Sequence, residues 1–214
     1  MEKKIVFAFD FDGTLASSFM LEDYCMAKAC QEAGFPLVNE ETVHQFYGPT
    51  EDGIIRKIVG DAKFSIAWEC FKTIYTEKSK DLKAFDGLHS LLQSLNKETK
   101  IALLTGRSRL TLDISLKDIG LDDCFPAIYT GSPFGSNKEA SMLSLIHDFH
   151  IQKKDVVYIG DTLEDIKMMK NISVDIISAG YSHDLLYQGQ LEELNPGNCV
   201  NTISQLADKI QDIR

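Results

Sequence analysis

The chain has 214 residues, 44% of them hydrophobic and 25% charged, which are ordinary proportions for a globular protein rather than a disordered or fibrous one. The net charge of -10 argues against nonspecific nucleic-acid binding, because that affinity comes mainly from cationic contacts with phosphates. No apolar stretch approaches the about 20 residues that span a bilayer, and the apolar run near the N-terminus is too short for a signal peptide. We therefore expect a soluble, cytoplasmic protein with no membrane partner.

The first predicted strand, residues 5–9, ends in two carboxylates. Asp10 and Asp12 stand two positions apart, which places side chains on the same face of a strand, but Asp12 lies where Gly13 already breaks the strand into a turn. One carboxylate therefore reaches a pocket from the strand and the other reaches it from the loop. Mg2+ binds through one or two carboxylates together with substrate phosphate, so the pair indicates a catalytic metal site. Taken alone, a turn that only caps the strand explains the motif equally well.

The next part of the chain, residues 17–84, shows helical patterns and no convincing strand. Gly34 ends the first helix, and Asn39 is the expected N-cap of the second. Trp68 and Phe71 lie on the apolar side of the last helix and are expected to be core residues. The expected helices cover residues 18–33, 40–46, 51–59 and 62–80. We predict an all-helical cap here, inserted into an α/β core formed by residues 1–16 and 85–214.

From residue 87 onward, helical and strand patterns alternate, which is typical of a parallel sheet with crossover helices. The expected strands cover residues 101–104, 127–129, 156–159 and 174–177. The expected helices cover residues 88–95, 108–120, 138–150, 162–170 and 203–213. The sequence therefore predicts an α/β fold built on a parallel sheet.

Polar side chains follow three of these strands. Asp10 follows the first strand, Thr105 follows residues 101–104, and Asp161 follows residues 156–159, while Lys138 opens a helix between the last two strands. In open α/β sheets, ligands bind outside the carboxyl ends of the strands, where the strand order reverses. We therefore expect these side chains to share one crevice.

Four motifs together resemble those of the haloacid dehalogenase superfamily, in the order and rough spacing of that family. They are residues 10–14, Thr105, Lys138 and residues 160–165. The similarity covers nearly the whole chain and points to the phosphatase branch, in its phosphoglycolate phosphatase-like group with a helical cap. It implies a doubly wound, Rossmann-like core. The chain departs from many capped relatives at Gly106 and Arg107, where they have Asn and a basic residue, and at Glu139, where they often have Pro.

The resemblance implies a role for each motif. Asp10 is the expected nucleophile and forms an aspartyl-phosphate, and Asp12 first protonates the leaving alcohol and then activates water as a base. Mg2+ is expected between the Asp10 carboxylate, the Asp12 backbone carbonyl and Asp161, with Asp165 orienting Lys138 or metal-bound water. Thr105 and Lys138 complete the expected catalytic set. The expected substrate contacts come from Phe11, Gly13, Thr14, Gly106 and Arg107.

Simpler explanations stay open for several of these residues. Asp161 and Thr162 are also common helix caps, Thr105 also fits a turn, and Lys138 also fits a solvated surface. An exposed pair with a nearby helix is the favoured alternative to a contact between Arg107 and a second anionic group of the substrate. Two segments similar to the substrate-facing ones of relatives are expected to be structural loops, namely residues 17–18 and 48–51. Five histidines form no triad and no zinc spacing: His44, His89, His147, His150 and His183.

We predict a Mg2+-dependent phosphomonoesterase that acts on a small phosphorylated metabolite such as phosphoglycolate, a sugar phosphate or a nucleotide. A phosphomutase shares the first step and stays open, as does a binding or regulatory protein that has lost turnover. A dehalogenase is disfavoured because it needs no acid at Asp12, and a phosphonate hydrolase would need a cap lysine in a recognisable context. The five cysteines are expected to be reduced. The sequence leaves both a monomer and a homodimer open.

Overall fold

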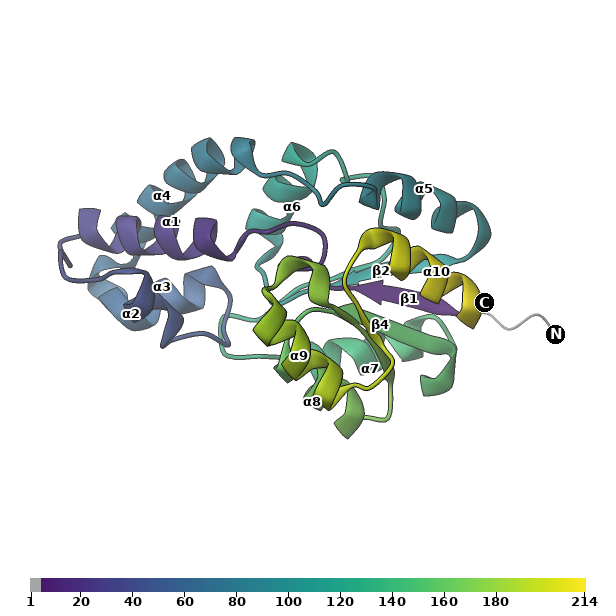
Figure 1. The fold of residues 1–214 in the computed structure, drawn as a ribbon. Helices are drawn as coiled ribbons and strands as arrows, with labels where there is room; N and C mark the ends of the chain where they lie inside the picture. The colour runs from purple at the N-terminus through teal and green to yellow at the C-terminus, as the bar shows by residue number, and fades with distance from the viewer. Residues whose placement is uncertain (1–4) are drawn as a thin grey trace.

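In the computed structural model, which describes residues 5–214, six parallel strands form one sheet in the order β3-β2-β1-β4-β5-β6. Figure 1 shows helices on both faces of this sheet. The strands are β1 (Val6–Phe9), β2 (Lys100–Leu104), β3 (Ile128–Tyr129), β4 (Val156–Gly160), β5 (Asp175–Ala179) and β6 (Cys199–Val200). The strand order reverses between β1 and β4, so the ends of these two strands and of β2 border the crevice in which such sheets bind ligands.

Alternation along β1 divides the core into two layers. Phe7 and Phe9 belong to one hydrophobic cluster, whereas Val6 and Ala8 belong to another, because successive side chains of a strand point to opposite faces. The first cluster is covered by α5 (Leu88–Glu98), α6 (Arg109–Asp118) and α10 (Ile203–Ile213). The second is covered by α7 (Lys138–Asp148), α8 (Leu163–Asn171) and α9 (Leu185–Leu194). The predicted doubly wound α/β fold is confirmed.

Four further helices separate β1 from β2 in the sequence and share a third hydrophobic cluster, which contains Met26, Ile55, Phe71 and Tyr75. They are α1 (Phe19–Glu32), α2 (Glu40–His44), α3 (Glu51–Val59) and α4 (Asp61–Lys78). Figure 1 shows them as a group beside the end of the sheet toward which β1 points. The division into a core of residues 1–16 and 85–214 and a cap of residues 17–84 stays a prediction, and residues 1–4 of it lie outside the described residues.

Most predicted elements agree with the structure to within a few residues. The helix predicted over residues 51–59 has the bounds of α3, and the Asn39 side chain accepts a hydrogen bond from the Thr42 backbone N–H at 2.9 Å, as an N-cap does. Three short 3-10 helices were not predicted: Ser79–Asp81, Lys153–Asp155 and Gly180–Ser182.

The helix α9 and the strand β6 were not predicted from the sequence either. The first turn of α9 exposes Leu185 and Leu186, and Gly189, a poor helix former, lies in the middle of the helix, so no apolar stripe of helical period is visible in the sequence. The strand β6 has only two residues, too few to show an alternating pattern.

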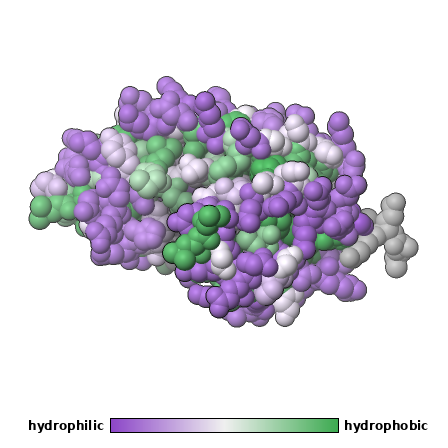
Figure 2. All heavy atoms as spheres, in the orientation of Figure 1, coloured by the Kyte–Doolittle hydropathy of each residue, from purple (hydrophilic) through white to green (hydrophobic). Residues whose placement is uncertain are grey.

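Many of the charged residues, which make up 25% of the chain, lie on the surface. Figure 2 shows that the face turned to the viewer is mostly hydrophilic. Within residues 5–214, no helix combines the length and the apolar character that crossing a membrane requires.

The helical cluster generates a stability prediction. Phe71 is fully buried in it, at 0% exposure, so we expect Phe71→Ala to lower the free energy of unfolding by about 3–5 kcal/mol through lost burial and a cavity. Urea denaturation followed by circular dichroism measures this change. Leu37→Ala is the control, because Leu37 is 91% exposed and its truncation should change stability by less than about 0.5 kcal/mol. Equal effects of the two substitutions would show that α1 to α4 do not share a packed core.

Candidate active site

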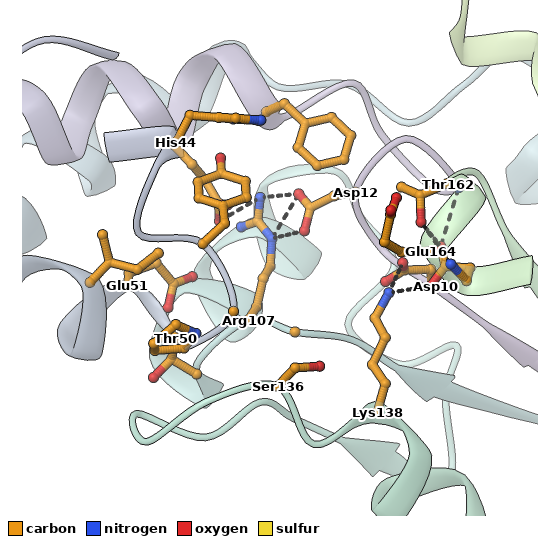
Figure 3. A pocket seen from close by; sticks show the side chains of 18 of the residues that line it. Asp10, Asp12, His44, Thr50, Glu51, Arg107, Ser136, Lys138, Thr162 and Glu164 are labelled. Atoms are coloured by element: carbon orange, nitrogen blue, oxygen red, sulfur yellow. Dashed lines mark hydrogen bonds and ion pairs between the residues drawn. The ribbon is translucent and has the colours of Figure 1, made fainter. Parts of the chain in front are cut away.

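A cavity of about 540 Å³ lies at the carboxyl ends of β1 and β2, and residues of α1, α3 and the segment before α3 also line it. Figure 3 shows its polar side chains. Asp10, Asp12, Arg107 and Lys138 all line this cavity although they are far apart in the sequence. Of the side chains expected to share one crevice, Asp10 and Lys138 line this cavity, whereas Thr105 and Asp161 are absent from its lining among the described residues.

Asp10 is held at the end of β1 by the sheet itself. Its backbone N–H donates to the Ile159 carbonyl at 2.8 Å, which extends the ladder between β1 and β4 by one residue. Its Oδ1 accepts a hydrogen bond from the Phe11 backbone N–H at 2.7 Å, and its Oδ2 pairs with Lys138 Nζ. Burial raises the pKa of Asp10 to about 7, while Lys138 opposes this rise. The carboxyl group is thus fixed in place and poorly hydrated.

Lys138 connects Asp10 to the loop after β4. Its Nζ also lies 2.8 Å from Asp165 Oδ1. The other oxygen of Asp165 accepts hydrogen bonds from the Thr162 backbone N–H at 3.2 Å and the Thr162 hydroxyl at 2.8 Å. Thr162 is the N-cap of α8, and the two residues form a capping box. The predicted orientation of Lys138 by Asp165 agrees with this geometry.

Three buried carboxylates lie close enough together to hold a metal ion. Oxygens of Asp10, Asp161 and Asp165 lie within 4.8 Å of one another. Asp161 Oδ2 contacts His183 Nε2 at 2.8 Å, whereas Asp161 Oδ1 is buried without a hydrogen-bond partner among the described residues. Burial raises the pKa of Asp161 to about 6. An unpartnered, buried carboxylate oxygen beside a second carboxylate suits a hard divalent cation.

The Asp12 carboxylate points away from these three carboxylates. It contacts Arg107 instead, with Nε at 3.0 Å from each of its oxygens and Nη2 at 2.6 Å from Oδ1, and it also accepts a hydrogen bond from the Ser18 hydroxyl. Figure 3 shows Asp12 and Arg107 facing each other while Lys138 reaches Asp10. The two carboxylates of the first motif therefore lie in different charge environments within one cavity.

The favoured expectation for Arg107, an exposed surface pair, is wrong. The residue is only 2% exposed, and its guanidinium lies over the Phe11 ring at 4.5 Å from the centroid. It pairs with Glu22 at 2.8 Å and donates to Ser115 Oγ at 3.1 Å and to the Tyr75 hydroxyl. Arg107 is buried because α1, α4 and α6 each contribute a polar partner to it, which the sequence around position 107 does not reveal.

The other residues expected to contact substrate differ in whether they reach the cavity. Gly106 lines the cavity. Phe11 and Thr14 are fully buried in the protein, and Thr105 is nearly so, with its hydroxyl 3.3 Å from the Arg107 backbone N–H. Side chains of Phe11, Thr14 and Thr105 are absent from the cavity lining among the described residues, so contacts from this part of the loop would come from its backbone. Their roles stay predictions.

Several cavity residues were not identified from the sequence. Residues 48–51 line the cavity, which differs from the purely structural loop that we expected, and Glu22 and His183 line it as well. The signal for His183 was its place after β5, a fourth parallel strand whose end borders the same edge of the sheet. Glu22 could have been noticed in the sequence as a carboxylate beside the apolar stripe of α1. Neither signal is specific without the fold.

Comparisons with known proteins agree with this fold. The family model described as haloacid dehalogenase-like hydrolase matches residues 7–179. A phosphoglycolate phosphatase of Nitrosococcus oceani is 22% identical over 211 residues, which cover 92% of each chain. Another, of Psychrobacter arcticus, is 27% identical over 227 residues, with 97% of this chain and 96% of the relative covered. The crystal structure of a predicted phosphoglycolate phosphatase from Haemophilus somnus superposes with a TM-score of 0.78 at 18% identity and covers 100% of both chains.

The turn after Asp12 generates a prediction about Gly13. Its φ is +66°, and an added Cβ would lie 2.0 Å from Asp161 Oδ2. Since Asp161 is buried and bonded to His183, it cannot move aside without losing that contact. We expect Gly13→Ala to lower the free energy of unfolding by more than the about 1–3 kcal/mol that a left-handed backbone costs by itself. Urea denaturation measures the loss.

Gly197→Ala is the control for this substitution. Gly197 has a φ of +72° and nothing within 4 Å of the added Cβ, so it reports the cost of the positive φ without a steric clash. Equal losses at Gly13 and Gly197 would contradict the close approach of the turn to Asp161.

Proposed function

Because the chain belongs to the haloacid dehalogenase-like hydrolase family, we propose that it hydrolyses phosphate monoesters of small metabolites, with Mg2+ as cofactor and Asp10 as nucleophile. The observation that supports this most is the convergence of Asp10, the Lys138 cation and the unpartnered Asp161 oxygen on one site. A phosphate monoester is anionic, so an anionic nucleophile approaches it only where the charge is compensated. Catalysis of phosphoryl transfer consists mostly of such compensation and of positioning.

The proposed reaction has two displacements at phosphorus. In the first, an Asp10 carboxylate oxygen forms a bond to phosphorus, the bond from phosphorus to the ester oxygen breaks, and Asp12 gives a proton to the departing alcohol. In the second, Asp12 takes a proton from water, the water oxygen bonds to phosphorus, and the bond to Asp10 breaks. Inorganic phosphate leaves, and both carboxylates return to their starting states.

Residues around Asp10 support these steps. The Phe11 backbone N–H and Lys138 fix the Asp10 carboxyl group, and Lys138 offsets negative charge as it builds up there. Arg107 and Ser18 orient Asp12. The Asp10 and Asp161 carboxylates would hold Mg2+, with the Asp12 backbone carbonyl as a further ligand. Bound there, the cation would neutralise phosphate oxygens.

We further propose that residues 17–84 act as a cap that shapes the space for the alcohol portion of the substrate. This is supported by α1 and α3, which contribute Glu22 and Glu51 to the cavity, and by the separate hydrophobic cluster of these helices. Relatives that are phosphoglycolate phosphatases make phosphoglycolate one substrate to test, beside sugar phosphates and nucleotides.

Activity tests the proposed nucleophile directly. We expect the purified protein to release phosphate from p-nitrophenyl phosphate with Mg2+ and to stop when EDTA is added. Asp10→Asn should lower kcat by at least about 1000-fold, since an amide does not attack phosphorus. Asp113→Asn is the control, because Asp113 is half-exposed and pairs with Arg109 on the surface. Lack of turnover by the wild type across a broad panel of phosphorylated metabolites would falsify the proposal.

Thermal stability tests the metal site. The folded-state pKa values of Asp10 and Asp161 are raised to about 7 and about 6. The folded protein thus binds more protons than the unfolded one between pH about 4 and 7, so without metal this contribution to stability falls as pH rises through that range. Mg2+ binds the ionised carboxylates and competes with protons. We expect saturating Mg2+ to raise Tm by roughly 5–10 °C at pH 8 and by much less at pH 5.

Differential scanning fluorimetry at constant ionic strength measures these shifts, with KCl replacing MgCl2 in the reference samples. Asp161→Asn should remove the Mg2+-dependent shift at pH 8. A shift that is equal at both pH values, or that survives in Asp161→Asn, would place the cation elsewhere.

A further inference from the structure

Every basic side chain that lines the cavity is already paired with a carboxylate. Lys138 contacts Asp10 and Asp165, and His183 contacts Asp161. On the other side of the cavity, Arg107 contacts Asp12 and Glu22, and His44 lies 3.8 Å from Asp23. Lys138 and His183 belong to the half of the cavity in which the phosphate would react. The half left for the alcohol portion of a substrate therefore contains Arg107 as its strongest cation.

Arg107 has no free face to offer a substrate anion. All three of its guanidinium nitrogens have partners: Nε and Nη2 contact Asp12, Nη2 also contacts Glu22, and Nη1 contacts Tyr75 and Ser115. The side chain is buried among these partners. A substrate carboxylate would have to displace Asp12 or Glu22, which would leave that buried acid without its counterion, and buried unpaired charge is strongly unfavourable.

The wall of the cavity around Arg107, formed by Asp12, Glu22, Glu51 and Arg107, contains more acidic than basic side chains. Glu51 is buried next to Glu22, and it accepts hydrogen bonds from the Ser108 backbone N–H at 2.9 Å and from the Thr111 hydroxyl. Burial raises the pKa of Glu22 well above its usual value, while Arg107 opposes this rise. Three carboxyl groups, those of Asp12, Glu22 and Glu51, surround one guanidinium. Even when Asp12 holds the proton that it donates in the proposed reaction, the wall has no excess positive charge to offer a substrate anion.

Glu22 contributes a carboxylate to this wall. It lines the cavity and is only 7% exposed, and its buried Oε1 lies 2.8 Å from Arg107 Nη2 as an ion pair. A carboxylate that borders the cavity can accept a hydrogen bond from a ligand that brings an O–H group. A ligand carboxylate brings only acceptors and repels it.

We infer that this site selects phosphate monoesters whose alcohol portion has no anionic group and presents hydroxyl groups to the Glu22 carboxylate. The inference rests on the proposed function and narrows its substrate class. It disfavours 2-phosphoglycolate, whose carboxylate would face the acidic wall. A neutral polyol or sugar phosphate has both features that the wall requires.

Two matched pairs of substrates test this selection. 2-Hydroxyethyl phosphate is compared with 2-phosphoglycolate, and glycerol 1-phosphate with 3-phosphoglycerate, since each pair differs mainly by a hydroxyl or a carboxylate. We expect kcat/KM with Mg2+ to be at least about 10-fold higher for the hydroxyl member of each pair. Where turnover is slow, competition against p-nitrophenyl phosphate compares the binding of the two members, and we expect the smaller inhibition constant for the hydroxyl member.

Equal or higher kcat/KM for the carboxylate members would overturn the inference while leaving the phosphatase proposal intact. Failure to hydrolyse p-nitrophenyl phosphate and every member of the panel would overturn the proposed function, and the inference with it.

Glu22→Gln and Glu51→Gln test whether these residues cause the selection. Each removes a negative charge, so we expect the preference for the hydroxyl member to fall by about 10-fold within the variant. The ratio is insensitive to partial unfolding, which lowers both rates alike. Glu32→Gln is the control on α1, since Glu32 is half-exposed and pairs with Lys28. A preference that is unchanged in both glutamate variants would overturn the assignment of selectivity to this wall.

Discussion

Two cations, the buried Arg107 and the partly buried Lys138, pair with carboxylates at the end of β1. Lys138 joins Asp10 to Asp165, and Arg107 joins Asp12 to Glu22. Buried carboxylates are tolerated only when they are paired and hydrogen-bonded, so these two side chains make the acidic site compatible with a folded protein. They also divide the cavity into two regions, because each cation takes one carboxylate of the first motif.

The fold explains how these partners meet. The strand order reverses between β1 and β4, so the loops after β1, β2 and β4 border one crevice. The helices α1 and α3 border this crevice and add Glu22 and Glu51. The sheet thus holds the proposed nucleophile Asp10 in place. The substrate that we propose is selected by helices that pack in a hydrophobic cluster of their own.

Much of the architecture was predictable because it follows from local patterns. Alternation of apolar strands and amphipathic helices predicted the parallel sheet, and the bounds of α3 and α10 agree with the prediction. The grouping of Asp10, Lys138 and Asp161 was predictable because strand ends of a parallel sheet share an edge. By contrast, α9 was missed because it exposes two leucines in its first turn, and burial of Arg107 was missed because its partners come from three separate helices.

The sequence by itself determined the fold class and the residues at the strand ends, because hydrophobic periodicity and motif spacing are properties of short stretches of chain. Only the tertiary structure decided which way Asp12 points, that Arg107 has no free face, and that Asp161 Oδ1 lacks a partner within residues 5–214. Those facts depend on contacts such as Asp12 with Arg107 and Thr111 with Glu51, between residues that are distant in the sequence. Pairing of buried charge across such distances is set by packing, which no local pattern encodes.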